Sequence, residues 1–380
     1  MNIAFLEDSF TPTRGGVERV TFTIGESLRS KGYGVYYIFR GVDSADSEAK
    51  YKYRFNNKVD KENQYTEIKD YIQKKYIKII ICQNLHTSKY SYIYNKLKHE
   101  CSIKIITVLH CNPDIWVNKN KWGDTTKKIF FKELLRSCCF SLFKNPYKER
   151  QKKMYEISDK YILLSEKFIP IFCKLNKVDG SKLSFIENPC FLEEDKNTDI
   201  RKENIVLIVA RMAEQQKRIL SAIKIWDSIY RLAPDWKMVI VGDGPDLNFY
   251  KAYANKKKME RISFMGSSKH VENYYEKAKI FMMTSIWEGF GLTLVEAQHY
   301  GCVPLAYDSY AAVSDIIKNG KNGFIIPLHN TDEYIEKLLL IMKDDKLFTT
   351  MSQCARESSK KLFNKKDIVN KWDRLLKELQ

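Results

Sequence analysis

Short apolar runs alternate with amphipathic segments along the whole chain. In the first half, runs such as "NIAFLED" (residues 2–8) and "IKIIIC" (residues 77–82) contain almost only apolar residues. Between such runs lie segments such as residues 16–32, in which apolar residues recur at the spacing of one helix face. Near-continuous apolar strands separated by helices are typical of a parallel sheet that helices cover on both faces. The pattern therefore predicts an α/β fold.

The same pattern starts again in the second half, with apolar runs such as "NIVLIVA", "KMVIVGDGP" and "IFMMTS". Residues 191–204 between the two sets are polar and charged, which indicates a linker. We therefore expect two doubly wound, Rossmann-like α/β domains facing each other across a cleft, at residues 1–190 and 205–365. The tail, residues 366–380, is predicted to form an amphipathic helix, because its apolar residues share one face. These residues are Ile368, Trp372, Leu375 and Leu376.

Ligands of such sheets bind outside the carboxyl ends of the strands, so the residues after each strand carry the chemistry. The stretch "TSIWEGFGLTLVEAQHYG" (residues 284–301) places Gly289 and Gly291 between a strand end and a helix start. Backbone N–H groups at a helix start bind anions, and glycine lets the backbone approach a ligand closely. A phosphate at this turn would place a ribose near Glu296 and the group beyond the phosphates near Glu288. A nucleotide-sugar has this order of groups. The alternative is that both acids only complement the helix dipole.

A second candidate site follows the strand "NIVLIVA", where Arg211 ends the strand and Lys217 is expected to open a helix. Arginine supplies a bidentate fork and lysine a point charge, a pair suited to a diphosphate. The alternative is that both are solvated surface cations, which are common in a chain with a net charge of +17. Their position at the mouth of a parallel strand favours phosphate binding.

The positive charge is concentrated in residues 1–190, which carry 34 Lys and Arg against 21 Asp and Glu. Such an excess indicates an acidic partner: nucleic acid, anionic lipid or a phosphorylated substrate. Residues 119–153 carry 11 of these cations against 3 acids, with apolar pairs at helical spacing. This segment is therefore either an interfacial helix on an anionic membrane or a core-facing helix with a solvated basic face.

Other features exclude rival classes of protein. No helix-turn-helix, RNA-recognition or zinc pattern occurs, which argues against a nucleic-acid partner. Neither G-x-G-x-x-G nor a P-loop motif follows a strand, which argues against a nicotinamide-linked dehydrogenase. The nine cysteines form no CxxC pair and no zinc spacing, which favours reduced thiols and a cytoplasmic protein with no metal site.

The motifs together resemble the retaining nucleotide-sugar glycosyltransferases of family four, which have the GT-B fold. The matching pieces include "RGGVERV", "VARMAEQQKR", "VIVGDGP" and "EGFGLTLVEAQHYGCVPLA". The resemblance implies that Arg211 and Lys217 bind the donor diphosphate and that Glu296 holds the ribose. It implies that Glu288 contacts the donor sugar near its reacting carbon. It also implies that the backbone of Phe290, Gly291 and Leu292 contacts the sugar and the phosphate. The tail helix of this fold crosses back onto the first domain.

The resemblance also implies roles for residues of both domains outside these loops. Gly15 and Gly16 would touch a donor phosphate or the acceptor, or would form a plain strand-to-helix turn. His110 would contact the donor sugar, with a hydrogen-bonded core histidine as the alternative; Cys111 after it stands where the family often has an acid. The base and ribose end would be lined by the backbone of Gly242, Gly244, Gly266 and Ser267.

These expectations define the predicted activity. The chain would move a sugar from a nucleotide-diphosphate sugar, with uridine as the expected base, to a saccharide acceptor while keeping the anomeric configuration. No metal or cofactor is expected, because Arg211, Lys217 and helix N-termini would neutralise the leaving diphosphate. The expected acceptor is a lipid-linked saccharide of capsule, lipopolysaccharide or related glycan assembly, reached from the inner face of the cell membrane. The alternative is a non-catalytic, sugar-nucleotide-binding partner of another transferase.

Overall fold

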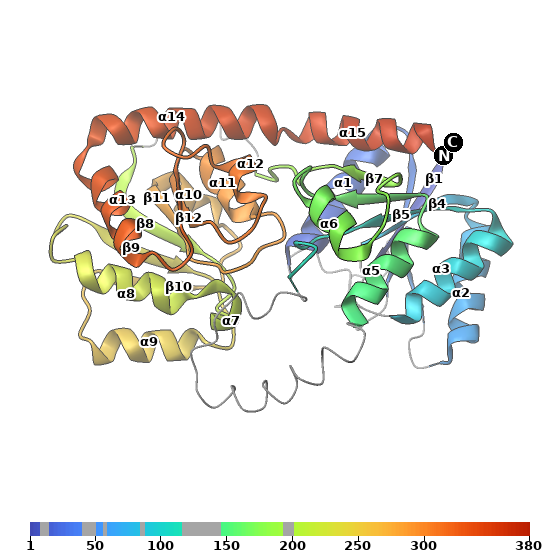
Figure 1. Ribbon diagram of the computed structural model, residues 1–380, viewed down its shortest axis with the longest axis horizontal. Coiled ribbons are helices and arrows are strands. Elements are labelled where there is room, and N and C mark those ends of the chain that lie inside the picture. The colour runs from blue at the N-terminus through green and yellow to red at the C-terminus, as the bar shows by residue number, and fades with distance from the viewer. Residues whose placement is uncertain (8–14, 40–50, 56–58, 84–87, 116–145, 193–200) are drawn as a thin grey trace. The chain divides into compact units, whose positions relative to one another are not determined.

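The computed structural model describes residues 1–7, 15–39, 51–55, 59–83, 88–115, 146–192 and 201–380 (Figure 1). The chain divides into two compact units. The first unit comprises Met1–Glu187 and Lys366–Gln380, and the second comprises Asn188–Lys365. Each unit is built around one parallel sheet, so the α/β fold predicted from the apolar runs is confirmed.

The first unit holds a seven-stranded sheet in the order β3-β2-β1-β4-β5-β6-β7, with every described pairing parallel. Its central strands read as continuous apolar runs because helices cover both of their faces. The strands and helices are β1 (Asn2–Glu7), α1 (Gly16–Ser30), β2 (Gly34–Phe39), β3 (Lys52–Arg54), α2 (Lys61–Lys74), β4 (Ile77–Cys82), α3 (Ser88–Cys101), β5 (Lys104–Val108), α5 (Pro146–Ile157), β6 (Lys160–Leu163), α6 (Phe168–Asn176), β7 (Leu183–Phe185) and α15 (Lys365–Glu378).

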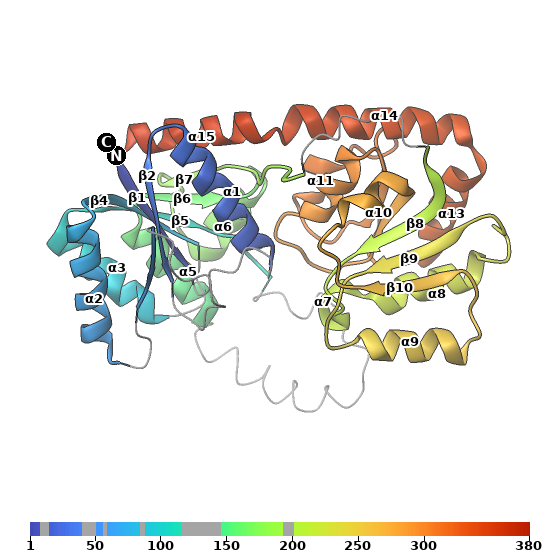
Figure 2. The same ribbon diagram turned by 180° about the vertical axis from the view of Figure 1, so that it is seen from behind.

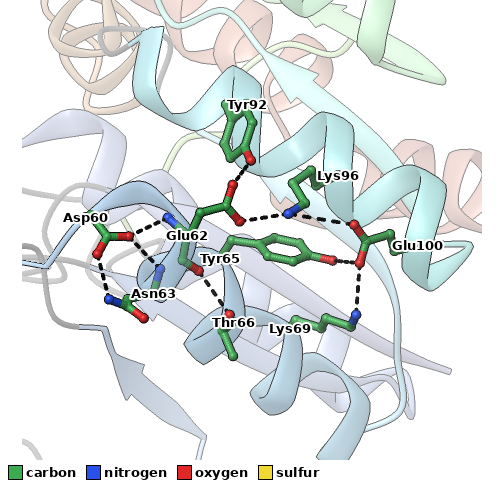
Figure 3. A network of polar contacts seen from close by, with 9 residues as sticks. All are labelled: Asp60, Glu62, Asn63, Tyr65, Thr66, Lys69, Tyr92, Lys96 and Glu100. Carbon is green, nitrogen blue, oxygen red and sulfur yellow. Dashed lines mark hydrogen bonds and ion pairs between the residues drawn. The ribbon is translucent and has the colours of Figure 1, made fainter.

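Helix α3 packs between α2 and α5, and polar contacts join α2 to α3 (Figure 3). Asp60 caps the start of α2 by accepting hydrogen bonds from two backbone N–H groups of its first turn. Lys96 on α3 lies 2.8 Å from Glu62 on α2 and 3.8 Å from Glu100 on its own helix. Lys69 on α2 lies 2.9 Å from Glu100. Exposed ion pairs of this kind contribute little energy each, so they orient the two helices more than they stabilise the unit.

Helix α15 is tied to the rest of the first unit by its apolar face and by polar contacts at its edge. Ile368, Trp372, Leu375 and Leu376 are all buried. The hydroxyl of Tyr33 donates a hydrogen bond to Asp373 at 2.7 Å. The ammonium of Lys371 lies 2.6 Å from Glu187.

The second unit holds a six-stranded parallel sheet in the order β10-β9-β8-β11-β12-β13. Strands β8, β9 and β10 lie side by side, and α7 follows the end of β8 (Figure 2). Strand β8 begins at Glu203, so the end of the segment 191–204 expected as a linker belongs to the sheet. The elements are β8 (Glu203–Val209), α7 (Glu214–Lys217), α8 (Ile219–Ile229), β9 (Lys237–Val241), α9 (Leu247–Lys256), β10 (Ile262–Gly266), α10 (Glu272–Lys277), β11 (Ala278–Met283), α11 (Leu292–His299), β12 (Val303–Tyr307), α12 (Val313–Ile316), β13 (Phe324–Ile326), α13 (Thr331–Lys343) and α14 (Asp345–Leu362).

One local expectation is wrong. Lys217 was expected to open a helix, but it is the last residue of the short helix α7, and α8 begins at Ile219. Arg218 between them has left-handed backbone angles (φ 48°, ψ 43°), which a continuing helix cannot contain. Glycine is the residue that adopts such angles at least cost.

The segment 119–153 lies mostly outside the described residues, so its interfacial helix stays a prediction. Its last part belongs to α5, which buries Tyr147, Gln151 and Met154. The amide of Gln151 donates a hydrogen bond to the carbonyl of Pro113 at 3.0 Å. In the described part of the chain, no helix combines the length and the apolar character needed to cross a bilayer. The cysteines of that part are all free thiols.

Candidate active site

The order of strands in the second unit creates a switch point between β8 and β11. The chain runs from β8 through β9 to β10, then returns to the other side of β8 to form β11, β12 and β13. The loops after β8 and β11 therefore leave neighbouring strands and diverge, which opens a crevice for ligands in sheets of this kind. Both candidate motifs, residues 211–217 and 284–296, follow these two strands.

Hydrogen bonds to backbone carbonyls join the two loops. The hydroxyl of Thr284 donates to the carbonyls of Lys217 and Arg218, at 3.0 Å each. The backbone N–H of Ile286 donates to the carbonyl of Gln216 at 3.0 Å. The side-chain amide of Gln216 returns a bond to the carbonyl of Trp287 at 3.2 Å. These bonds hold the end of α7 against the residues that precede the Gly-Phe-Gly turn.

The side chains of Lys217 and Glu288 form an ion pair at the centre of these loops. Lys217 Nζ lies 2.5 Å from Glu288 Oε1, and the two side chains are only 18% and 11% exposed. Both charges are largely removed from water, so each depends on the other for its stabilisation. The structure therefore brings together a cation and an acid that the sequence placed in separate motifs.

The turn between β11 and α11 requires glycine at residue 291. Gly291 caps the start of α11 with φ 93°, in the left-handed region. A Cβ atom there would lie 2.3 Å from the hydroxyl oxygen of Tyr310, so a side chain has no room. Helix α11 begins at Leu292, and the first N–H groups of a helix have no carbonyl partner in a preceding turn. The N–H of Leu294 donates to the carbonyl of Gly291 at 2.9 Å. Phe290 before the turn is buried, and its ring meets Phe363 edge-on at 5.6 Å between centroids.

Glu296 lies within α11 and is 3% exposed. Its Oε2 accepts a hydrogen bond from the hydroxyl of Tyr275 on α10 at 3.0 Å. The predicted hydrogen bonds of Glu296 to a ribose stay a prediction. Tyr275 was not recognised from the sequence, because it precedes Glu296 by 21 residues and belongs to no motif.

The remaining predicted residues of the second unit lie at the same edge of the sheet. Arg211, directly after β8, is exposed. Gly242 has φ 134°, and a Cβ there would lie 1.9 Å from the carbonyl oxygen of Ala210, the neighbour of Arg211. The N–H of Gly242 donates to the carbonyl of Gly266 at 2.7 Å. Ser267, the residue after Gly266, is exposed. Gly244 (φ 156°) packs in the same way against the backbone of Met212.

In the first unit, His110 and Gly15 occupy the expected positions after a strand and before a helix. His110 follows β5, and its Nε2 is hydrogen-bonded to the side-chain oxygen of Gln83, which follows the neighbouring strand β4. Gln83 was not identified from the sequence. Gly15 caps α1, which begins at Gly16. The roles of Gly15, Gly16 and His110 in contacting a donor or acceptor stay predictions.

Cys111, beside His110, is a partly buried thiol held by a tyrosine. Its Sγ lies 2.8 Å from the hydroxyl of Tyr147, and burial raises its pKa to about 11. The thiol is therefore protonated near neutral pH, and it does not replace the acid that the family often has at this position. Within the described ranges, His, Cys, Asp and Glu side chains do not gather in groups of three or more that would hold a metal ion.

Known proteins resemble this chain in sequence. Residues 191–358 match the family model described as "Glycosyl transferases group 1". The chain is 26% identical over 236 residues to poly(glycerol-phosphate) alpha-glucosyltransferase of Bacillus subtilis, covering 60% of this chain and 34% of that protein. It is 23% identical over 369 residues to an uncharacterized glycosyltransferase of Haemophilus influenzae, covering 95% and 96%. It is 29% identical over 215 residues to UDP-Gal:alpha-D-GlcNAc-diphosphoundecaprenol alpha-1,3-galactosyltransferase of Escherichia coli, covering 52% and 54%.

Solved structures show the same fold along the full chain. Pneumococcal O-GlcNAc transferase GtfA in complex with UDP and GlcNAc has a TM-score of 0.79 at 12% identity, covering 100% of this chain and 99% of that one. Anabaena HepE in complex with UDP has a TM-score of 0.77 at 14% identity, covering 100% of both chains. The predicted GT-B fold is therefore confirmed.

Proposed function

We propose, from the match of residues 191–358 to the glycosyl transferases group 1 family, that the chain transfers a sugar from a UDP-sugar to a saccharide acceptor with retention of the anomeric configuration. The observation that carries the proposal is the ion pair between Lys217 and Glu288. It joins the cation suited to a diphosphate and the acid suited to a sugar at the switch point of a parallel sheet, where ligands bind.

Lys217, Arg211 and the start of α11 would bind the donor diphosphate. Charge-assisted hydrogen bonds from Lys and Arg to phosphate oxygens are among the stronger ones in proteins, at about 1.5–3 kcal/mol each. The first-turn N–H groups of α11 add the favourable end of the helix dipole. A leaving diphosphate gains negative charge as its bond to the sugar breaks, so these groups stabilise the transition state more than the ground state. They would do so without a metal ion.

Glu288 would orient the donor sugar and stabilise the positive charge that develops at its reacting carbon. We propose that the leaving phosphate accepts the proton of the acceptor hydroxyl on the same face of the sugar, which keeps the anomeric configuration. Glu296 would accept hydrogen bonds from the ribose hydroxyls, and Gly242, Gly266 and Ser267 would line the base. His110 would contact the donor sugar.

The proposed acceptor is a lipid-linked saccharide in the synthesis of a surface polysaccharide. Two relatives act in related chemistry by their names: the diphosphoundecaprenol galactosyltransferase of Escherichia coli, and the amylovoran biosynthesis glycosyltransferase AmsD of Erwinia amylovora. The basic excess of residues 1–190 supports an acidic partner such as a diphosphate-linked lipid or an anionic membrane surface. The chain would then act at the cytoplasmic face of the membrane.

The first test is binding and slow hydrolysis of a panel of UDP- and GDP-sugars by the wild type, Glu288→Gln and Lys217→Ala. We expect one donor to be bound and cleaved, with cleavage lost in Glu288→Gln and binding weakened in Lys217→Ala. Lys224→Ala serves as a control, because Lys224 is an exposed cation on α8. Binding without cleavage, with Glu288→Gln equal to the wild type, would instead identify a non-catalytic partner of another transferase. Failure to bind any nucleotide-sugar would reject both functions.

A further inference from the structure

Tyr310 has a buried hydroxyl group with no hydrogen-bond partner in the described part of the chain. The residue is 4% exposed, and its hydroxyl oxygen is shielded from solvent. A buried hydroxyl without a partner costs free energy, so such groups are rare in folded proteins. Tyr310 follows β12, the strand next to β11 in the sheet, and no motif of the sequence includes it.

The hydroxyl lies directly beneath the Gly-Phe-Gly turn. It is 2.3 Å from the point where a Cβ of Gly291 would stand, and Gly291 is three residues after Glu288. The neighbouring Ser309 donates a hydrogen bond to the carbonyl of Ser285 at 2.8 Å, which ties the loop of Tyr310 to the same segment. The hydroxyl is therefore held in place within the candidate active site.

The hydroxyl is a hydrogen-bond donor at all physiological pH values. Burial raises the pKa of Tyr310 well above its ordinary value of 10.0, and the negative charges of Glu288 and then Asp315 raise it further. The charged groups that act on this hydroxyl are Glu288 on the loop after β11 and Asp315 on α12, and Glu288 in turn is paired with Lys217 on α7. Of the two acids, Glu288 belongs to the proposed site.

In the proposed function, Lys217 interacts with two anionic groups, the carboxylate of Glu288 and the donor diphosphate. In the structure its ammonium donates to Oε1 of Glu288. A donor diphosphate would compete for the same ammonium, because phosphate oxygens are strong acceptors for Lys. Glu288 would then need a second hydrogen-bond donor to keep its carboxylate oriented in a largely buried position.

We propose that Tyr310 is a positioning residue of Glu288: its hydroxyl donates a hydrogen bond to the Glu288 carboxylate when a donor diphosphate engages Lys217. This inference rests on the proposed function, since it assumes that Lys217 binds phosphate and that Glu288 acts on the sugar. A hydroxyl that is unpartnered in one arrangement of the loop and bonded in another would be maintained for its role in the reaction rather than for stability.

The test is Tyr310→Phe, which removes only the hydroxyl oxygen and keeps the ring beneath Gly291. Because the hydroxyl has no partner in the described structure, we expect Tyr310→Phe to melt at or above the temperature of the wild type. We expect the kcat for hydrolysis of the cleaved UDP-sugar to fall about tenfold, the effect of losing a hydrogen bond to a charged group. The KM for that donor and the Kd for UDP, measured by calorimetry, should change by less than about twofold.

Tyr307→Phe is the matched control. Tyr307 is the last residue of β12, it is 2% exposed, and its hydroxyl also has no partner in the described part of the chain. Its ring packs against Tyr334. Beyond the adjacent residues of the chain, the three atoms nearest to a Cβ at Gly291 belong to Tyr310 and Leu294, so none of them is from Tyr307. We expect Tyr307→Phe to keep the kcat of the wild type.

Four outcomes would overturn the inference. Wild-type kcat in Tyr310→Phe would show that the hydroxyl has no part in the reaction. An equal loss in Tyr307→Phe would indicate a general effect of removing buried hydroxyls. A weaker UDP affinity with unchanged kcat would assign Tyr310 to donor binding instead. If the wild type neither binds UDP nor cleaves any UDP-sugar, the proposed function itself fails, and this inference fails with it.

Discussion

The hydroxyl of Tyr275 donates a hydrogen bond to Oε2 of Glu296 at 3.0 Å, and both side chains are buried. The bond joins α10 to α11 and fixes the orientation of the acid that we expect to hold the ribose. A buried carboxylate needs such a donor, because an isolated buried charge is costly.

Tyr275→Phe should lower the free energy of unfolding by about 1.5–3 kcal/mol, because a buried hydrogen bond to a charged group is lost. If Glu296 binds the ribose, the KM for the donor should rise several-fold while kcat changes little. Urea denaturation and donor kinetics measure the two effects. Tyr274→Phe on the same helix is the control, and equal behaviour of the two variants would contradict the role of Tyr275.

The pair of Lys217 and Glu288 should show energetic coupling in a double-mutant cycle. Because both side chains are largely buried, we expect a coupling free energy of roughly 1–2 kcal/mol from urea denaturation of Lys217→Ala, Glu288→Ala and the double variant. The exposed pair of Lys237 and Glu203, at 2.9 Å, should show a much smaller coupling. Similar couplings for both pairs would mean that burial does not strengthen the Lys217–Glu288 contact.

Gly291→Ala should destabilise the second unit for two separable reasons. The left-handed backbone of residue 291 costs about 1–2 kcal/mol for any side chain. The new Cβ would also clash with the hydroxyl of Tyr310. Adding Tyr310→Phe should recover the part of the loss that comes from the clash.

Gly320→Ala is the control for the backbone term, because Gly320 has φ 76° and no atom within 4 Å of a Cβ. We expect a loss of about 1–2 kcal/mol that Tyr310→Phe does not change. If Tyr310→Phe fails to improve Gly291→Ala, the close approach of these two residues is not what excludes a side chain.

Acid should weaken the attachment of α15 to the first unit through Asp373. The hydrogen bond from Tyr33 and the charges of Lys377 and Lys31 lower the pKa of Asp373 below its ordinary value of 3.8. A carboxylate with a lowered pKa in the folded state contributes stability above the unfolded value, and this contribution is lost as pH falls through the folded value.

The measurement is the urea midpoint of the wild type and of Asp373→Asn between pH 6 and pH 3. The wild type should be the more stable protein at pH 6, and the difference should shrink as pH falls below about 4. Tyr33→Phe removes the largest cause of the lowered pKa of Asp373. At pH 6 this variant should also be less stable than the wild type, by a smaller amount than Asp373→Asn. A difference that is independent of pH would exclude titration of Asp373 as its cause.

Much of the fold follows from short-range patterns. The apolar residues of the runs at residues 77–82 and 303–307 are buried in strands, with Lys78 the one exposed residue of the first run, because a parallel sheet covered on both faces selects continuous apolar sequences. The short strand β3 (Lys52–Arg54) was not expected, because its residues are polar or only half-buried at the edge of the sheet. The pattern of apolar positions therefore predicts the central strands of the sheet better than its edge strands.

The structure places Arg211, Glu288 and Gly289 in loops that follow strands, as the motifs predict, and Glu296 lies further along, within α11. The helix expected to start at Lys217 starts at Ile219 instead. Arg218 adopts left-handed backbone angles, which cannot be predicted from an arginine in the sequence.

The sequence by itself determined that two parallel α/β sheets form and that Lys217, Glu288 and Glu296 follow strands, because periodicity and spacing are properties of neighbouring residues. Only the tertiary structure decided which of these residues meet. Lys217 pairs with Glu288 across 71 positions, Tyr275 reaches Glu296, and Tyr310 lies under Gly291. Such contacts depend on which strands become neighbours in the sheet, and that order results from packing of the whole unit rather than from any local stretch of sequence.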